Sequence, residues 1–113
     1  MSHDSYAAIF DMAQAVETAL RLSSGMSEAE FIENETVQWA IFSQIIILGE
    51  AAGRVGREFQ DTHADIPWSG IIGMRHRLIH GYDTVDWVRI WKTLKSELPA
   101  LLSRLGALLQ KEE

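Results

Sequence analysis

Apolar positions along the chain recur with the 3.6-residue period of an α-helix, and no stretch alternates as a half-buried strand does. The apolar residues of the first segment share one helical face: Ile9, Met12, Ala13, Val16 and Leu20. Gly25 is suited to ending that helix. Ser27 and Glu30 have the spacing of a capping box, so a second helical stretch is predicted to begin there.

The middle of the chain, from about residue 34 to residue 55, is apolar on nearly all sides. Such a pattern is typical of a central helix that is buried on several faces. A polar loop is expected at residues 61–65, and Pro67 is placed for the first turn of a third helix. That helix is predicted to run to about His80 and to end at Gly81.

The last third of the chain predicts further helices. Asp83 and Thr84 are candidate N-caps for a fourth helix, which Pro99 kinks or restarts. The closing segment carries a leucine stripe: Leu98, Leu101, Leu102, Leu105, Leu108 and Leu109. The whole pattern predicts an all-α protein with one domain over residues 1–113, an antiparallel bundle of four to five helices.

Composition narrows the possible functions. Hydrophobic residues make up 47% of the chain and charged residues 23%, as in an ordinary globular domain. The absence of cysteine excludes disulfides, a thiolate nucleophile and cysteine-based metal sites. A net charge of −6 argues against broad, charge-driven binding of nucleic acid. However, residues 1–65 hold 3 Lys+Arg against 11 Asp+Glu, whereas residues 66–113 hold 7 against 5. One interpretation is simply a solvated acidic face on the first half; the other is that a polyanion, if one binds, approaches the second half.

No targeting or membrane segment is recognised in the sequence. Residues 1–5 lack the basic and apolar regions of a signal peptide. The longest apolar stretch, residues 39–48, has about half of the roughly 20 residues that a membrane helix needs. We therefore expect a cytoplasmic protein without a membrane partner.

The densest polar cluster lies at the end of the third predicted helix and comprises Arg75, His76, Arg77, His80 and Tyr82. One interpretation is metal-free cleavage of an RNA phosphodiester. Histidine serves the proton transfers, and arginine stabilises the developing phosphorane, so His80 and Arg75 supply one group of each kind. Five residues turn an ideal helix by about 140° beyond a full turn. The two side chains therefore share a site only if the helix unwinds at Gly81 or a second subunit completes the site.

Other interpretations of this cluster remain open. His76 and His80 are one turn apart and could ligate a metal with Glu50 or Asp83, although the glutamate of a zincin motif is absent. The cluster could also form an anion or nucleotide pocket without chemistry. In a structural interpretation, which the residue pattern alone favours, Arg75 and Arg77 pair with acids and His80 caps the helix.

Two further features bear on the site. Glu50 lies at the end of the apolar helix, where a carboxylate is costly to bury unless it is paired, so a structural role holding an arginine of segment 75–80 is expected. The aromatic residues are expected in the core or a dimer interface, with Trp68 as the candidate exception that stacks on a base: Trp39, Phe42, Trp68, Trp87 and Trp91.

Residues 66–68 and 73–82 resemble the HEPN superfamily, specifically the HepT-like toxins. The signature of that family is an arginine, four to six residues, a histidine, and a tyrosine two residues later. Arg75, His80 and Tyr82 match it, and His76 fits the polar position after the arginine. Residues 48–52 and 98–99 resemble two further blocks of the family.

The resemblance implies a helical bundle that forms a homodimer, in which Arg and His of both subunits face a shared cleft. It also implies a metal-independent endoribonuclease toxin, without a cofactor, in a type VII-like toxin–antitoxin pair. In such a pair the antitoxin is a minimal nucleotidyltransferase that neutralises the toxin by transferring AMP to the tyrosine of the motif, here Tyr82.

Together these observations predict a cytoplasmic, homodimeric ribonuclease toxin whose partners are RNA and the nucleotidyltransferase. Arg75 and His80 are the predicted catalytic residues; His76, Arg77 and Glu50 support the cleft. An alternative is a non-catalytic HEPN subunit that binds the nucleotidyltransferase and holds a nucleotide in the Arg75/His80 cleft. A third is a structural helical dimer in which the motif is fortuitous.

Overall fold

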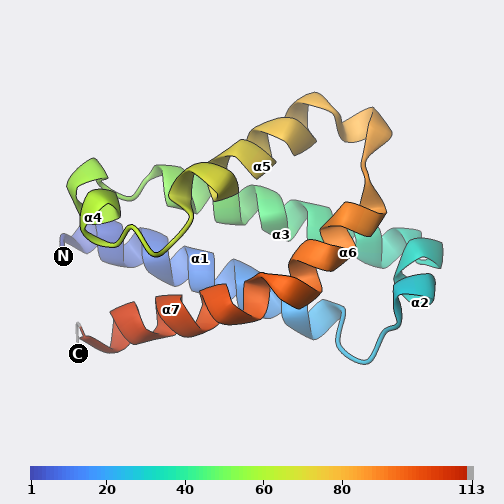
Figure 1. Ribbon diagram of the computed structural model, residues 1–113, viewed down its shortest axis with the longest axis horizontal. Helices are drawn as coiled ribbons and strands as arrows, with labels where there is room; N and C mark the ends of the chain where they lie inside the picture. The colour runs from blue at the N-terminus through green and yellow to red at the C-terminus, as the bar shows by residue number, and fades with distance from the viewer. Residues whose placement is uncertain (112–113) are drawn as a thin grey trace.

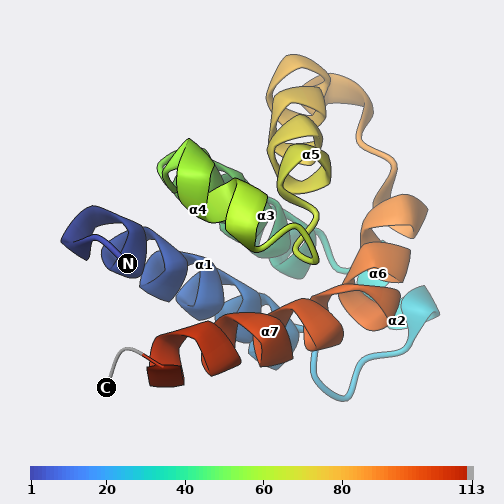
Figure 2. The ribbon, with the colours of Figure 1, turned by 60° about the vertical axis from the view of Figure 1, so that its left-hand side comes forward.

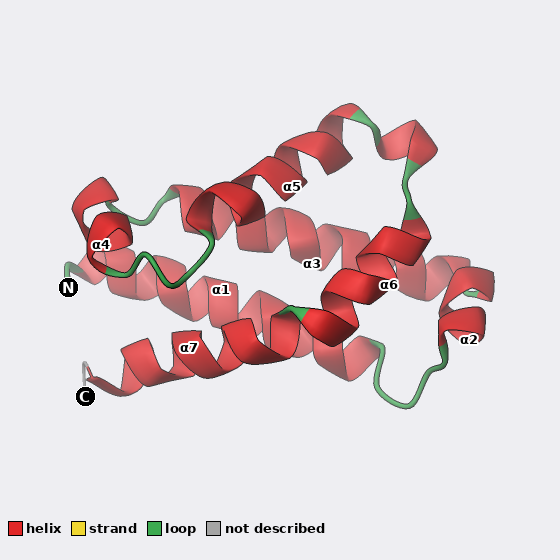
Figure 3. Cartoon of the chain, viewed as in Figure 1, coloured by secondary structure: helices red, strands yellow, loops and turns green. Residues whose placement is uncertain are grey.

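The computed structural model describes residues 1–111, which contain helices and connecting loops but no strand (Figures 1 and 3). The elements follow in this order: α1 (His3–Leu22), α2 (Glu28–Glu33), α3 (Glu35–Gly53), α4 (Arg57–Thr62), α5 (Trp68–His80), η1 (Tyr82–Thr84), α6 (Trp87–Ser96) and α7 (Leu98–Lys111). The expected all-α class is confirmed. Within the described residues there are seven α-helices, more than the four to five expected, because α2 and α4 are separate six-residue helices.

Most helix ends lie where the side-chain signals predict them. Gly25 has a φ of +78° and ends the turn after α1. The capping box before α2 is present: the Glu30 backbone N–H donates to Ser27 Oγ (3.1 Å), and the Ser27 N–H donates to Glu30 Oε1 (2.9 Å). The backbone N–H of Ser27 stabilises the charged carboxylate and lowers the pKa of Glu30. Helix α5 ends at His80, as expected, with Gly81 as its C-cap.

One expected boundary is shifted and one is wrong. The polar loop predicted at residues 61–65 begins only at His63, because residues 57–62 form α4, a short exposed helix whose polar residues look like a loop in sequence. Asp83 and Thr84 do not cap α6; they lie in the 3₁₀ turn η1. The cap is Asp86, whose carboxylate accepts a hydrogen bond from the Arg89 backbone N–H (3.1 Å). Pro99 is the second residue of α7 and separates it from α6, as expected.

The long helices pack in an antiparallel arrangement around one core. Helix α1 packs against α3 and α7, α3 packs against α5, and α6 packs against α7. Figure 1 shows that α3 runs opposite to α1 and to α5, and that the start of α1 and the end of α7 lie on the same side. The core includes four members of the leucine stripe: Leu98, Leu101, Leu105 and Leu108. No helix within residues 1–111 is long and apolar enough to cross a membrane.

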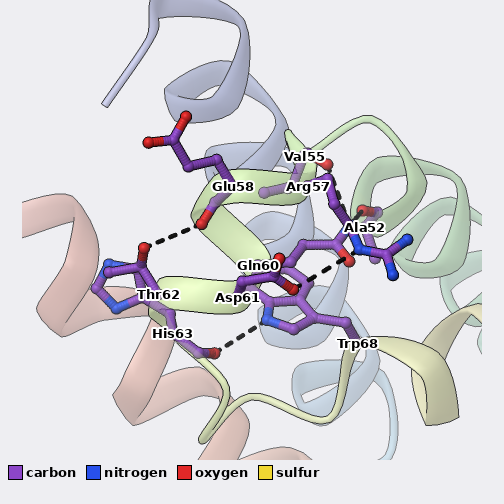
Figure 4. A network of polar contacts seen from close by, with 9 residues as sticks. All are labelled: Ala52, Val55, Arg57, Glu58, Gln60, Asp61, Thr62, His63 and Trp68. Carbon is purple, nitrogen blue, oxygen red and sulfur yellow. Dashed lines mark hydrogen bonds and ion pairs between the residues drawn. The ribbon is translucent and has the colours of Figure 1, made fainter.

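A local hydrogen-bond network fixes the start of α5 (Figure 4). Gln60 Nε2, on α4, donates to the backbone carbonyls of Ala52 (3.3 Å) and Val55 (3.1 Å) at the end of α3. The indole N–H of Trp68 donates to the carbonyl of His63 (3.0 Å), and its side chain is only 6% exposed. Trp68 is thus part of the core, and the idea that it stacks on a base is wrong for this conformation.

Candidate active site

A glycine on α3 sets how closely α5 approaches. Gly49 is buried, and a Cβ added there would collide with the Cβ of Arg75. The same added atom would lie 3.1 Å from both Cγ and Cδ of that arginine. Any larger residue at position 49 therefore forces Arg75 or the whole of α5 outward. The close packing of α5 on α3 thus explains why the segment 48–52 contains a glycine.

Arg75 lies between α3 and α5 and is paired with Glu50. The guanidinium Nη2 donates to Glu50 Oε1; the arginine side chain is 23% exposed and the glutamate side chain 55%. This is the pairing expected for a carboxylate at the end of an apolar helix. The Nε of Arg75 is buried and has no hydrogen-bond partner among the described residues. The guanidinium is therefore held in place, yet part of its donor capacity is unused.

His76 and His80 lie on another face of α5 and are exposed. Their rings are stacked one turn apart, with centroids 6.2 Å apart and planes inclined by 11°. Tyr82 follows in η1 and is 64% exposed. The second half of the motif is thus open to solvent, whereas Arg75 is half-buried.

One protomer does not bring Arg75 and His80 into contact. No hydrogen bond or ion pair joins them within residues 1–111, and α5 stays helical through His80. The end of α5 therefore does not unwind in this structure to bring the two side chains together. A second subunit is the other route by which the two groups could share a site.

His76 and Arg77 lie in different cavities. His76 lines a hollow between α4 and α5, together with Arg57 and Asp61. Arg77 lines a cavity of about 510 Å³ between α5, α6 and α7, together with Arg89 and Arg104. These last two arginines were not singled out from the sequence. The basic surplus in residues 66–113 was the signal that pointed toward them.

The metal interpretation finds no set of ligands in the described part of the chain. No three His, Cys, Asp or Glu side chains in residues 1–111 lie close enough together to hold a metal ion. Glu50, one of the expected third ligands, is engaged by Arg75 instead.

Comparisons with known proteins agree with the motif. A family model described as "Ribonuclease HepT-like" matches residues 12–108. A protein of Thermococcus cleftensis named "Probable ribonuclease HepT" is 32% identical over 107 residues, covering 95% of this chain and 96% of that protein. A protein of Caldanaerobacter subterraneus named "Putative RNase TTE0752" is 34% identical over 100 residues, covering 88% and 89%. None of the solved structures matches the chain significantly.

The family model spans most of the helical core, from the middle of α1 to near the end of α7, and includes the whole segment that carries Arg75, His80 and Tyr82. The two relatives are matched over nearly their full lengths. The chain belongs to the HepT-like ribonuclease family.

Proposed function

We propose that the protein is a metal-independent endoribonuclease that acts as a homodimeric toxin in the cytoplasm. The observation that supports the proposal is membership of a ribonuclease family together with the geometry of α5, where Arg75 is anchored and His80 is exposed. His80 is the acid–base residue, and Arg75 binds the scissile phosphate. His76 and Arg77 flank these two residues on α5, each in a different cavity of the protomer, and Glu50 positions Arg75.

The proposed chemistry is transfer of the phosphodiester to the neighbouring ribose 2′-hydroxyl. One imidazole removes the 2′-OH proton, the 2′-oxygen attacks phosphorus, and a protonated imidazole gives its proton to the leaving 5′-oxygen. Histidine suits both transfers, because imidazole ordinarily titrates near neutral pH. The planar guanidinium of Arg75 stabilises the charge on the phosphorane oxygens. Two histidines and two arginines become available when two protomers share the cleft.

An exposed apolar stripe on α3 supports the dimer. Trp39 is 41% and Ile47 is 44% exposed, and both lie on the same helical face as Glu50. Exposed large apolar side chains on one helix face are typical of an interface. A contact made there would place the partner protomer beside the Arg75–Glu50 pair. Arg75 is the motif residue that does not meet His80 within one protomer.

The exposure of Tyr82 supports its role as the modification site. A nucleotidyltransferase can reach a phenol that is 64% exposed on a short turn without unfolding the domain. In the reaction, the phenolic oxygen bonds to the α-phosphorus of ATP and pyrophosphate leaves. The added AMP phosphate lies two residues from His80, where it would compete with RNA for the cationic site.

The proposal is tested with purified protein and a labelled RNA in buffer containing EDTA. We expect cleavage by the wild type and a loss of at least about 100-fold in His80→Ala, because one proton-transfer group is removed. Circular dichroism should show unchanged helicity, since His80 is exposed. Cleavage that needs an added divalent metal would contradict the mechanism.

Expression in cells separates the toxin from the non-catalytic alternative. A ribonuclease toxin arrests growth, and His80→Ala relieves the arrest; a binding subunit does neither. In vitro, the cognate nucleotidyltransferase and ATP should add the mass of one AMP to the wild type and none to Tyr82→Phe. If AMP is also added to the Tyr82→Phe protein, Tyr82 is not the modification site.

A further inference from the structure

A groove on the opposite side of α5 from His76 is separate from the Arg75–Glu50 pair. Its larger part is the cavity of about 510 Å³ between α5, α6 and α7; a second hollow of about 210 Å³ adjoins it. The two share Arg77, Arg89 and Thr93 in their walls, so they form one continuous groove. Figure 2 shows α5 standing away from α6 and α7 while it stays close to α3. We call this feature the α5–α7 groove.

The α5–α7 groove is lined by three arginines. Arg77 and Arg89 form no ion pair within the described residues, although the chain has 16 acids against 10 basic residues. Arg104 Nη1 donates to the backbone carbonyl of Asp65 (3.1 Å), and no carboxylate of residues 1–111 pairs with its charge.

The acids in the groove are fewer than the arginines. Glu97 lines the larger part and Asp86 the smaller part, where the Asp86 carboxylate already accepts the Arg89 backbone N–H. Three guanidinium groups therefore face two carboxylates, one of which serves as a helix cap. The surplus is cationic in a protein whose total charge is −6. A concave wall of this kind concentrates positive potential.

Shape and position indicate which anion fits. Apolar side chains also line the groove: Met74 is half-buried and offers a surface for a base or a ribose, whereas Ile71 and Leu101 are buried. The smaller end of the groove reaches Gly81 and Thr84, the residues on either side of Tyr82 and Asp83. The groove thus begins beside the exposed end of the motif and continues along α6 and α7. A chain with a regular spacing of phosphates matches arginines that are spread over three helices better than one compact anion does.

We infer that the α5–α7 groove binds the single-stranded RNA segment next to the scissile phosphate, with its backbone phosphates on Arg77, Arg89 and Arg104. The inference rests on the proposed ribonuclease function. It assigns binding of the substrate strand to residues that lie away from the Arg75–Glu50 pair. It also separates Arg77 from Arg75: Arg75 acts at the bond that is cut, and Arg77 acts on the strand beyond it.

Binding is measured in the His80→Ala background by fluorescence anisotropy of a labelled single-stranded RNA across a salt series. Arg89→Gln and Arg104→Gln should each raise Kd about 5-fold to 10-fold at low salt. Each should reduce the slope of log K against log salt by about 0.7, the value for one lost phosphate contact with a single strand. Both residues are exposed, so unchanged circular dichroism is expected.

Arg21→Gln is the matched control. Arg21 is exposed on α1, outside the groove, and makes no ion pair among the described residues. The same charge change there should leave Kd within about 2-fold of the parent, because a distant exposed charge is screened by salt. Equal effects of Arg21→Gln and Arg89→Gln would overturn the inference, since only general charge would then matter.

Cleavage by otherwise wild-type protein separates the two proposals. Arg89→Gln should raise KM and leave kcat near the wild-type value, whereas His80→Ala loses kcat. If Arg89→Gln and Arg104→Gln cleave RNA with an unchanged KM, the groove does not bind the substrate strand, but the proposed ribonuclease activity stands. RNA binding that depends on the groove arginines, without any cleavage, would contradict the proposed ribonuclease activity and support the groove as an RNA-binding site. Displacement of RNA by low concentrations of AMP would show a mononucleotide pocket and overturn the strand model.

Discussion

Two faces of α5 carry Arg75 and His80, and the two side chains differ in how firmly they are held. Toward α3, Arg75 is 23% exposed, lies against Gly49 and is paired with Glu50. On the other face, His76 and His80 are exposed and contact each other through stacked rings. The group proposed to bind phosphate is thus built into helix packing, whereas the group proposed to transfer protons is exposed.

This difference has a physical basis. A group that stabilises developing charge works best when it is already oriented, because it then needs no reorganisation during the reaction. A group that exchanges protons needs access to substrate and water. The comparison predicts that substitutions on the α3 side affect stability as well as activity, whereas substitutions on the histidine face affect activity alone. Four experiments test this, from the largest expected effect to the smallest.

The largest effect is expected from Arg75→Lys. The positive charge stays, but the planar fork that contacts Glu50, and that is proposed to bind the scissile phosphate, is lost. Single-turnover cleavage of RNA should fall about 100-fold or more. Arg54→Lys is the control, since Arg54 is also ion-paired, with Asp11 at 2.9 Å, but lies after the end of α3 and outside the hollow that His76 lines. Similar losses in both variants would contradict a special role for the arginine on α5.

The next effect is on stability, from Gly49→Ala. The added methyl group collides with Arg75, so the free energy of unfolding should fall by about 1–3 kcal/mol, the usual cost of overpacking. Gly53→Ala is the matched control on the same helix, where an added Cβ meets nothing within 4 Å. That variant should be as stable as the wild type or more so. Urea unfolding measures both, and equal destabilisation would show that α3 and α5 do not meet as described.

A smaller effect is expected from Glu50→Gln, which keeps the shape of the side chain and removes its charge. Because the pair is partly exposed, the loss of stability should be about 1 kcal/mol or less. Asp11→Asn breaks the Arg54–Asp11 pair (2.9 Å), whose side chains are 60% and 47% exposed, and should cost less. Urea midpoints rank the two variants. The reverse ranking would show that Glu50 does not hold Arg75 in solution.

The smallest effect is expected from His76→Ala on stability. Its ring is exposed and lies stacked on the ring of His80, so the free energy of unfolding should change by less than about 0.5 kcal/mol. Thermal unfolding followed by circular dichroism measures it. A loss as large as that of Gly49→Ala would remove the distinction between the two faces.

Local signals in the sequence predicted much of the fold. The Ser27–Glu30 capping box, the end of α5 at Gly81 and the break at Pro99 are decided by neighbouring residues, so a sequence can reveal them. Helix α4 and the cap at Asp86 were missed. A polar six-residue helix has no apolar stripe to reveal it, and Asp83 and Asp86 are equally good caps until the chain path chooses one.

The candidate site divides in the same way. The sequence by itself determined the all-α class, the motif of Arg75, His80 and Tyr82, and the 140° between the first two, because helical periodicity and spacing are local properties. Only the tertiary structure decided that Gly49 admits Arg75, that Trp68 is buried, and that Arg77 lies in a groove with Arg89 and Arg104. These contacts join residues far apart in the chain, and helix packing alone brings them together.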